Sequence, residues 1–512
     1  MTPAQAVPYS VRMGYALDRI ISVVAPGLGN ARLAARDDLT ARMYAAAKPT
    51  EDLNGWLPYD GDVNSVIRSS STTVRSRVRQ LVRDFPYAKR AEKLRNALIV
   101  GNGIRMQARF KSPDGTMNRE VNKVLEGSFA EWAQKADITE TQSFVDLQNL
   151  ADRQLFECGE YFFIKRYMKG KKHPLRLQPI EADRLPFGDG TAKVADGHEI
   201  KDGIEYEKAT GKPVFYHFQD DGFAAKAIRV PADLVIHGYE MERPGQLRGI
   251  SPIASAVMVA GNLADLLDSE LEAMRMAARH VAFVQTNDIP GFQKGVNSRG
   301  KGQDGKKKSN VEYLNHATIQ YLRQGDNFTL AKVDRQSGTF EPYIKFNVRT
   351  FVICAGLTYE LVSGDYDKIS YSNLRGIRMD LSVVIQPIQR QHIGWLCRPV
   401  SAAWLESSML SIPALLPYAR LLTPKSYAFI APGMESADRL KDVKADADEI
   451  DLGVNSPQRI CSRRGVDYRE ILDELKEAKD EAERRGLTLG NINTALATNP
   501  AELMADGGKE EG

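Results

Sequence analysis

The stretch RGISPIASAVMVAGNLADLLDSELEAMRMAARHVAF, residues 248–283, carries the clearest periodicity in this 512-residue chain. Ser251 can cap a helix here, and Pro252 suits a first helical turn. The spacing predicts one long helix of roughly 45 Å, at about 1.5 Å per residue, with a narrow apolar seam. Such a seam is what helices packed side by side require. The seam positions alternate in steps of four and three and are 253, 257, 260, 264, 267, 271, 274, 278 and 281.

Two further helical segments follow this helix after a stretch of different composition. Residues 286–340 contain GFQKGVNSRGKGQDGKKKSN and then the alternating ATIQYL and NFTLAKV, which together predict a small β excursion. Residues 345–357 predict a second helix. LVSGDYDKISYSNLRGIRMD, residues 361–380, then predicts a polar turn at Gly364 and a third, long helix. Pro387 lies in the middle of that helix and removes one backbone hydrogen bond, so we expect a kink.

The first part of the chain has the patterns of several helices. Residues 31–48 and 64–100 are expected to be helical, and Pro86 is expected to divide the second of these segments. Residues 118–136 and 143–157 predict two more helices.

A β-rich body is expected at residues 158–240. YFFIKRY and LRLQPI, joined by KGKKHP, predict a strand, a loop and a strand, and further short strands follow with Gly and Asp between them. Near the other end, residues 467–486 predict a charged helix with many acid–base pairs at i, i+4 spacing. The sequence therefore predicts an α+β protein.

The net charge of +3 hides an uneven distribution along the chain. Residues 1–111 hold 18 Lys/Arg against 9 Asp/Glu, whereas residues 435–512 hold 12 against 19. Opposite charge at the two ends suggests different partners, although solvated helix faces explain either end equally well. Within residues 68–95, nine basic residues stand against two acidic ones. This run could contact nucleic acid, and a basic helix docked on an acidic neighbour is an equally good interpretation.

The motifs of common enzymes and metal sites are not found in the sequence. Residues 295–302 resemble a phosphate-binding loop as far as Lys301, but Gly302 stands where a metal-binding Ser or Thr is needed. The seven histidines form no HExxH motif, and the sequence has no GxSxG nucleophile motif. We therefore expect no catalytic residue, no metal, no cofactor and no enzyme activity. A membrane span is not expected either, because no apolar run approaches ~18 residues.

Four stretches, in this order, resemble the portal proteins of tailed bacteriophages, specifically their lambda-like branch. The match spans roughly residues 30–485. The stretches are RSRVRQLVRDFPYAKRAEKLRNALIVGNGI, then GEYFFIKRY with LRLQPIEADRL, then VPADLVIHGYEMERPGQLRGISPI, and finally AGLTYELVSGDYDKISYSNLRGIR.

The resemblance implies a ring-forming portal fold with a β-containing wing, a two-helix stem interrupted by a clip, a kinked tunnel helix and a helical crown. The implied boundaries are 1–30 for an N-terminal arm that can be disordered, 31–249 for the wing, 250–285 for the first stem helix, 286–340 for the clip, 341–360 for the second stem helix, 361–372 for the tunnel loop, 373–439 for the tunnel helix and the return to the wing, 440–490 for the crown, and 491–512 for a disordered tail.

The resemblance also implies a function and a set of partners. Portal proteins form oligomeric rings, usually dodecamers, at a unique capsid vertex, and double-stranded DNA passes through the ring during packaging and ejection. The implied partners are further copies of the chain, double-stranded DNA without sequence specificity, the terminase large subunit of the motor, the major capsid and scaffold proteins, and head–tail connector proteins. The implied location is the virion, assembled in the host cytoplasm.

Two sets of residues gain an implied role from the resemblance. Asp365 and Asp367 in the tunnel loop would repel phosphates and keep contact transient, while Lys368 could tether DNA weakly. The basic tip of the clip would dock the motor, although a solvated tip explains it as well. The loop residues expected to line the DNA channel are Ser363, Gly364, Asp365, Tyr366, Asp367, Lys368, Ser370, Tyr371, Ser372 and Arg375, and the clip residues are Lys294, Arg299, Lys301, Lys306, Lys307 and Lys308.

Two alternatives remain at this point. A nucleic-acid-processing enzyme with a basic N-terminal arm would need a carboxylate cluster or a phosphate loop, and the one near-match fails at Gly302. A neck or adaptor ring protein would generally be shorter, and the order helix, clip, helix, loop, helix over residues 250–405 argues against it.

Overall fold

The computed structural model of the chain describes residues 61–188, 194–220, 227–285, 311–314, 317–322, 337–367, 369–434 and 439–485, together with residues 21, 25–28 and 32. Met1–Val66 and Ile67–Gly512 form two separate compact units. Several expectations lie wholly or almost wholly outside the described residues: the N-terminal arm, the helix at 31–48, the phosphate-loop candidate at 295–302, the strand NFTLAKV and the tail at 491–512.

Two helices open the described part of the chain and are divided at the expected proline. α3 spans Val63–Asp84, and α4 spans Pro86–Ile99. Phe85 between them is extended, with φ −107° and ψ 113°, because the residue before a proline is disfavoured in the helical conformation. After α4, Gly103 has φ +105°, and a Cβ there would lie 2.5 Å from Cγ2 of Val145. Only glycine fits this turn, which leads into β1 (Arg105–Ala108).

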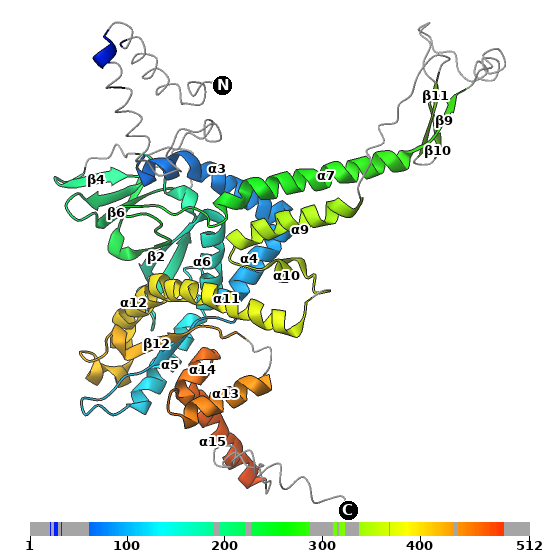
Figure 1. The fold of residues 1–512 in the computed structure, drawn as a ribbon. Coiled ribbons are helices and arrows are strands. Elements are labelled where there is room, and N and C mark those ends of the chain that lie inside the picture. The colour runs from blue at the N-terminus through cyan, green and yellow to red at the C-terminus, as the bar shows by residue number, and fades with distance from the viewer. Residues whose placement is uncertain are drawn as a thin grey trace, which may run out of the picture. The chain divides into compact units, whose positions relative to one another are not determined.

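The next elements confirm two expected helices and the β-rich body (Figure 1). α5 spans Arg119–Ala133 and α6 spans Phe144–Cys158, and Ser143 with Asp146 forms a capping box at the start of α6. β2 (Glu160–Tyr167) lies between β3 (Leu175–Ile180) and β8 (Val235–Tyr239), antiparallel to both, so the expected hairpin is present. A four-stranded antiparallel sheet follows in chain order, made of β4 (His198–Lys201), β5 (Ile204–Glu207), β6 (Pro213–Gln219) and β7 (Ala227–Pro231).

The long helix is present but is shorter than expected at both ends. α7 spans Val257–Arg279 and follows a 3₁₀ turn at Ala254–Ala256. Ser251 is not its cap, because α7 begins only at Val257; the Ser251 hydroxyl donates to the carbonyl oxygen of Phe156 at 2.7 Å and accepts from the N–H of Ile253 at 3.4 Å. His280–Gln285 is the strand β9, parallel to β11 (Ala317–Leu322), which pairs in turn with β10 (Val311–Leu314). The expected β excursion therefore begins inside the stretch that was predicted to be helical.

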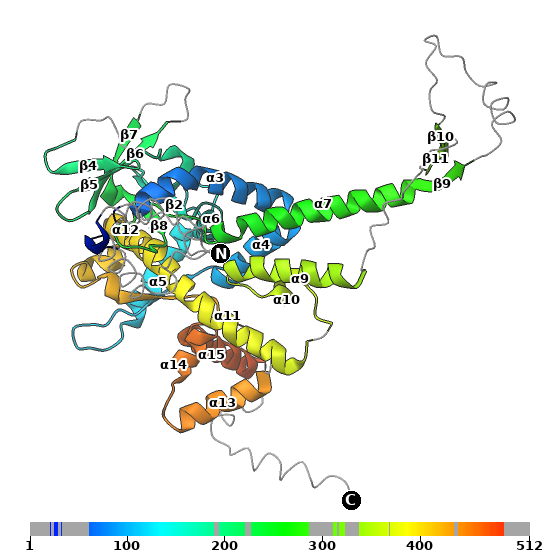
Figure 2. The ribbon, with the colours of Figure 1, turned by 45° about the horizontal axis from the view of Figure 1, so that its top comes forward.

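The C-terminal half is mostly helical. α9 (Ser337–Cys354) begins earlier than expected and lies beside α7 (Figures 1 and 2). α10 (Tyr359–Ser363) and α11 (Tyr371–His392) enclose the polar loop, and Pro387 lies inside α11 as expected. A π-helical turn at Ile393–Cys397 joins α11 to α12 (Arg398–Ser408). The remaining elements are β12 (Tyr427–Ile430), which is antiparallel to β1, α13 (Arg439–Asp451), α14 (Pro457–Arg463) and α15 (Tyr468–Arg484).

Two large apolar clusters hold these elements together. The first joins α5, α6, β2, β3 and α12, and in it the rings of Phe129 and Trp404 meet edge to face with centroids 5.1 Å apart. The second joins α3, α4, α7, α9, α10 and α11, with Phe85 against Phe351 at 6.2 Å. The fold is thus a mixture of helices and sheets. Among the described helices, none combines the length and apolar character needed to span a bilayer.

The seam of α7 is buried along only part of its length. Val257 and Ala260 are buried in the same cluster as Val348 of α9. Further along the same seam, Leu271 is 46% exposed and Met274 is 51% exposed. The second half of α7 therefore presents apolar side chains that the described residues of this chain do not cover.

Candidate functional site at the loop between α10 and α11

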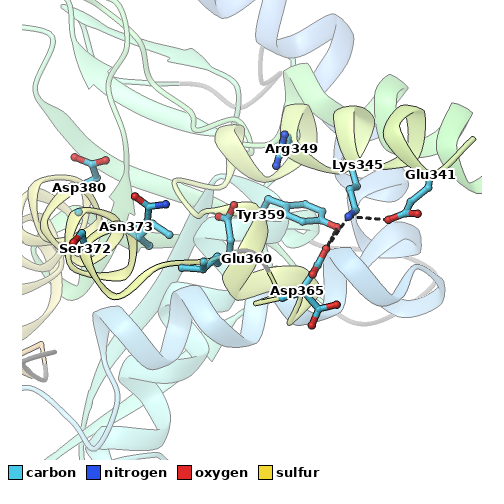
Figure 3. Close-up of a pocket in the computed structure, with 13 residues that line it drawn as sticks. Glu341, Lys345, Arg349, Tyr359, Glu360, Asp365, Ser372, Asn373 and Asp380 are labelled. Carbon is cyan, nitrogen blue, oxygen red and sulfur yellow. Dashed lines mark hydrogen bonds and ion pairs between the residues drawn. The ribbon is translucent and has the colours of Figure 1, made fainter. Parts of the chain in front are cut away.

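A hollow of about 770 Å³ lies between α9, α10, the loop that follows α10, and α11 (Figure 3). Side chains of both charges line it, and acidic ones predominate. The carboxylates are Glu341, Glu360, Asp365, Asp367 and Asp380, and the cations are Lys345 and Arg349.

Local sequence fixes both ends of the loop. Gly364 ends α10 in the left-handed conformation, with φ +74°, and its N–H donates to the carbonyl oxygen of Glu360. Ser370 begins α11, and its hydroxyl accepts a hydrogen bond from the N–H of Asn373 at 3.3 Å. The chain between these two caps is short and polar, as the sequence predicted.

One ion pair attaches the loop to α9. Nζ of Lys345 lies 2.8 Å from Oε1 of Glu341 and 3.0 Å from Oδ2 of Asp365 (Figure 3). The Tyr359 hydroxyl donates to the same Asp365 oxygen at 3.3 Å. The hydrogen bond from Lys345 is the main reason that the pKa of Asp365 is lowered, and the bonds to Glu341 and Asp365 raise the pKa of Lys345. Both groups therefore remain charged around neutral pH, and the ion pair persists.

The structure brings some of the loop residues together and places others elsewhere. Asp365, Asp367 and Ser372 line the hollow, whereas Tyr366 and Tyr371 are exposed. Arg375 has Nη2 3.6 Å from Oδ1 of Asp442 on α13, an interaction that the sequence did not suggest. Lys368 and the clip residues Lys294, Arg299, Lys301, Lys306, Lys307 and Lys308 lie outside the described residues.

Sequence reasoning missed the part of the site that lies on α9. Glu341, Lys345 and Arg349 follow each other at intervals of four, so they share one helix face. That spacing was visible in the sequence, but nothing showed that this face turns toward the loop. Arg349 also lies over the ring of Tyr359, with its guanidinium carbon 5.1 Å from the ring centroid.

The basic run at residues 68–95 is largely engaged within the chain. Arg75 is buried and contacts Glu160 at 3.0 Å and Asp183 at 2.8 Å. Arg79 pairs with the same Asp183, and Arg95 lies 3.6 Å from a carboxylate oxygen of Asp152. These contacts favour the interpretation of a basic helix docked on acidic neighbours over that of a nucleic-acid surface.

The motif RPGQLRG, residues 243–249, places an arginine in the centre of the fold. Arg248 is 1% exposed, and Nη2 lies 2.6 Å from Oε1 of Glu160. Its Nη1 donates to the carbonyl oxygens of Leu185 and Asp202. Burial alone would raise the pKa of Glu160, but Arg248 and then His237 hold it well below its ordinary value. Glu160 is therefore a structural anion that joins α3, β2, β8 and this turn.

The described side chains of this site interact through ion pairs, hydrogen bonds and ring contacts. Over the ranges that the structure describes, no group of three or more His, Cys, Asp or Glu side chains is arranged to hold a metal ion. His237 contacts Glu160 at 3.3 Å through Nε2 and the Tyr216 hydroxyl at 3.3 Å through Nδ1.

Comparison with known proteins places this architecture in one family. Over 480 residues the chain is 25% identical to a probable portal protein of Halomonas phage phiHAP-1, covering 89% of this chain and 90% of that protein. It is 21% identical over 477 residues to portal protein B of Escherichia phage lambda, covering 85% and 88% of the two chains.

A solved structure and a family description complete the comparison. A chain from the neck of a native gene transfer agent particle, computed with C12 symmetry, is 12% identical, with a TM-score of 0.41 over 76% of this chain and 93% of that one. The family model described as phage portal protein, lambda family, matches residues 50–389. Because that match covers well over half of the sequence, the chain belongs to the lambda family of phage portal proteins.

Proposed function

We propose that this portal protein closes into a ring, expected to be a dodecamer, whose channel carries double-stranded DNA during packaging and ejection. Membership of the portal family over residues 50–389 is the observation that carries the proposal. Copies related by one repeated head-to-tail contact form a ring when the rotation closes. The ring sits at one capsid vertex of the virion and guides DNA mechanically, without enzyme activity of its own.

The sub-structures of the ring follow the order of the elements. α7 and α9 form the two-helix stem, and the segment between them forms the clip, which meets the terminase motor and later the head–tail connector proteins. The helices and sheets up to β8 form the wing, and α13–α15 form the crown. Capsid and scaffold proteins contact the outside of the ring. The side-by-side packing of α7 and α9 and their place before the polar loop support this order.

The loop between α10 and α11 is proposed as the tunnel loop that faces DNA. Five carboxylates and two cations line the hollow beneath it, so the local field repels phosphate groups more than it attracts them. Repulsion keeps contact transient, which suits a polymer that must slide through. The hydroxyls of Tyr366 and Tyr371, on exposed side chains, can contact a passing backbone without reading its sequence.

Replacing residues 363–370 with a Gly/Ser linker of the same length tests this assignment. Rings should still form, as seen by electron microscopy of the purified protein, while particles assembled with the variant should retain less DNA. The matched control replaces residues 208–210, in the exposed turn between β5 and β6, with Gly/Ser. Normal DNA content with the loop variant would contradict the loop's role, and an unaltered protein that stays monomeric would contradict the ring.

A further inference from the structure

Four buried side chains with unpartnered polar atoms lie near the C-terminal end of α11. They are Arg95 of α4, Asp152 of α6, Tyr161 of β2 and His392 at the end of α11, and none is more than 6% exposed. Among the described residues, no hydrogen-bond partner is found for Nη1 of Arg95, Oδ1 of Asp152, Oη of Tyr161, or either ring nitrogen of His392.

These side chains form two pairs that interact with each other electrostatically. Nη2 of Arg95 lies 3.6 Å from Oδ1 of Asp152, which is within ion-pair range but too long for a hydrogen bond. The rings of Tyr161 and His392 have centroids 6.3 Å apart. Burial lowers the pKa of His392 to about 4, and the charges of Asp152 and Arg95 act on it in opposite directions. The imidazole is therefore neutral at pH 7, with one nitrogen donating and the other accepting.

Such a concentration of unmet polar atoms is rare in folded proteins. Buried polar groups are almost always hydrogen-bonded, to protein or to ordered water, because leaving them unpaired costs the full desolvation penalty. Five unpaired atoms on four such side chains would cost an amount comparable with the whole stability of a domain. A ligand that can both donate and accept must therefore complete the cluster.

We propose that at least two ordered water molecules occupy this junction and bridge α4, α6, β2 and α11. Water suits the set because it can accept from Arg95 and Tyr161 and donate to Asp152. One water is not enough, since the two nitrogens of His392 point in different directions and have opposite roles. These waters hold the end of α11 directly before the π-helical turn at Ile393–Cys397. The inference depends on buried atoms within one chain and not on the proposed ring or loop.

Substitution of Tyr161 with Phe distinguishes a hydrated cluster from a dry one by the sign of its effect. If water accepts from the hydroxyl, Tyr161→Phe removes a hydrogen bond and lowers the Tm of the full-length protein by about 2–4 °C. If the hydroxyl is buried without a partner, the same change removes a polar group whose desolvation no hydrogen bond offsets, and the Tm rises. Tyr167→Phe is the matched control, because Tyr167 lies on the same strand with an exposed side chain, and its Tm should not change.

A structure of the assembled protein at a resolution that shows water provides the second measurement. Density is expected at hydrogen-bonding distance from Oη of Tyr161 and from both nitrogens of His392. The water beside Tyr161 should be displaced or lose its contact in Tyr161→Phe. An unchanged or raised Tm for Tyr161→Phe, or an empty junction with clear water density elsewhere in the core, would overturn the proposal.

Discussion

At the scale of single residues, the fold depends on one buried anion. Glu160 is fully buried, and it accepts hydrogen bonds from Arg248, from Arg75 and from the backbone N–H of Gly249. Replacing a buried ion pair as a whole can be nearly neutral, but removing one partner leaves an uncompensated charge. Arg248 matters most, because its bonds to two backbone carbonyls also fix the turn before α7.

Arg248→Met should therefore destabilise the protein by about 3–5 kcal/mol, the cost of removing one partner of a buried charge, because Arg75 alone does not replace the contacts that Arg248 makes. The measurement is the free energy of unfolding in urea. Lys172→Met is the contrasting variant: Lys172 and Glu131 form an ion pair of 2.5 Å, but both side chains are about half exposed. That change should cost less than about 1 kcal/mol. Equal costs for the two variants would show that the Glu160 network does not hold the fold together.

At the scale of elements, the sequence predicted the structure where a pattern was compatible with only one type of secondary structure. Pro86 allowed only a break between α3 and α4, and the structure confirms it. The sequence HVAFVQ, residues 280–285, is compatible both with a continued helix and with a strand. In the structure this segment is a strand, because it pairs with β11. Such long-range pairing cannot be read from a local pattern. The kink expected at Pro387 stays a prediction.

The loop between α10 and α11 shows the same limit for the site. Its position and its polarity were predicted from residues 361–380 alone, whereas the cap at Ser370 was found only in the structure. Its attachment to α9 could not, because the Lys345–Asp365 pair joins two elements whose relative placement depends on the packing of the second apolar cluster.

Lys345→Met should release the loop from α9. Without this ion pair, no contact of Asp365 reaches α9, and the carboxylate keeps hydrogen bonds from Tyr359 and from the backbone of Asp367, so backbone amides of residues 364–367 should exchange with solvent several-fold faster. Hydrogen–deuterium exchange measures this directly. Glu341→Gln is the matched control, since it breaks the other contact of Lys345 and leaves the Asp365 pair in place. Equal exchange in the wild-type protein and Lys345→Met would mean that the loop is held by its helix caps alone.

At the scale of the whole molecule, we expect assembly to use apolar surface that one chain leaves uncovered. A single copy buries the first half of the α7 seam and leaves Leu271 and Met274 exposed. Full burial of one such side chain is worth about 1.5–3 kcal/mol, so a contact repeated at every subunit of a ring gains substantially from covering both. The regular seam that first indicated a long helix therefore serves two purposes, packing within the chain and, we expect, packing between copies.

The double variant Leu271→Glu, Met274→Glu should prevent ring closure without unfolding the chain. Two carboxylates placed in an apolar contact must be desolvated at every interface around the ring, whereas in the monomer they remain in water. Light scattering after size-exclusion chromatography should show a monomer or small oligomers, and the far-ultraviolet circular dichroism should match that of the wild type. Ser269→Glu on the same helix is the control: it adds a carboxylate at an exposed position outside the seam, so rings should persist. Intact rings from the double variant would mean that the second half of α7 does not lie between subunits. The contact that closes the ring would then involve other exposed apolar side chains, such as Met379 and Val383 of α11.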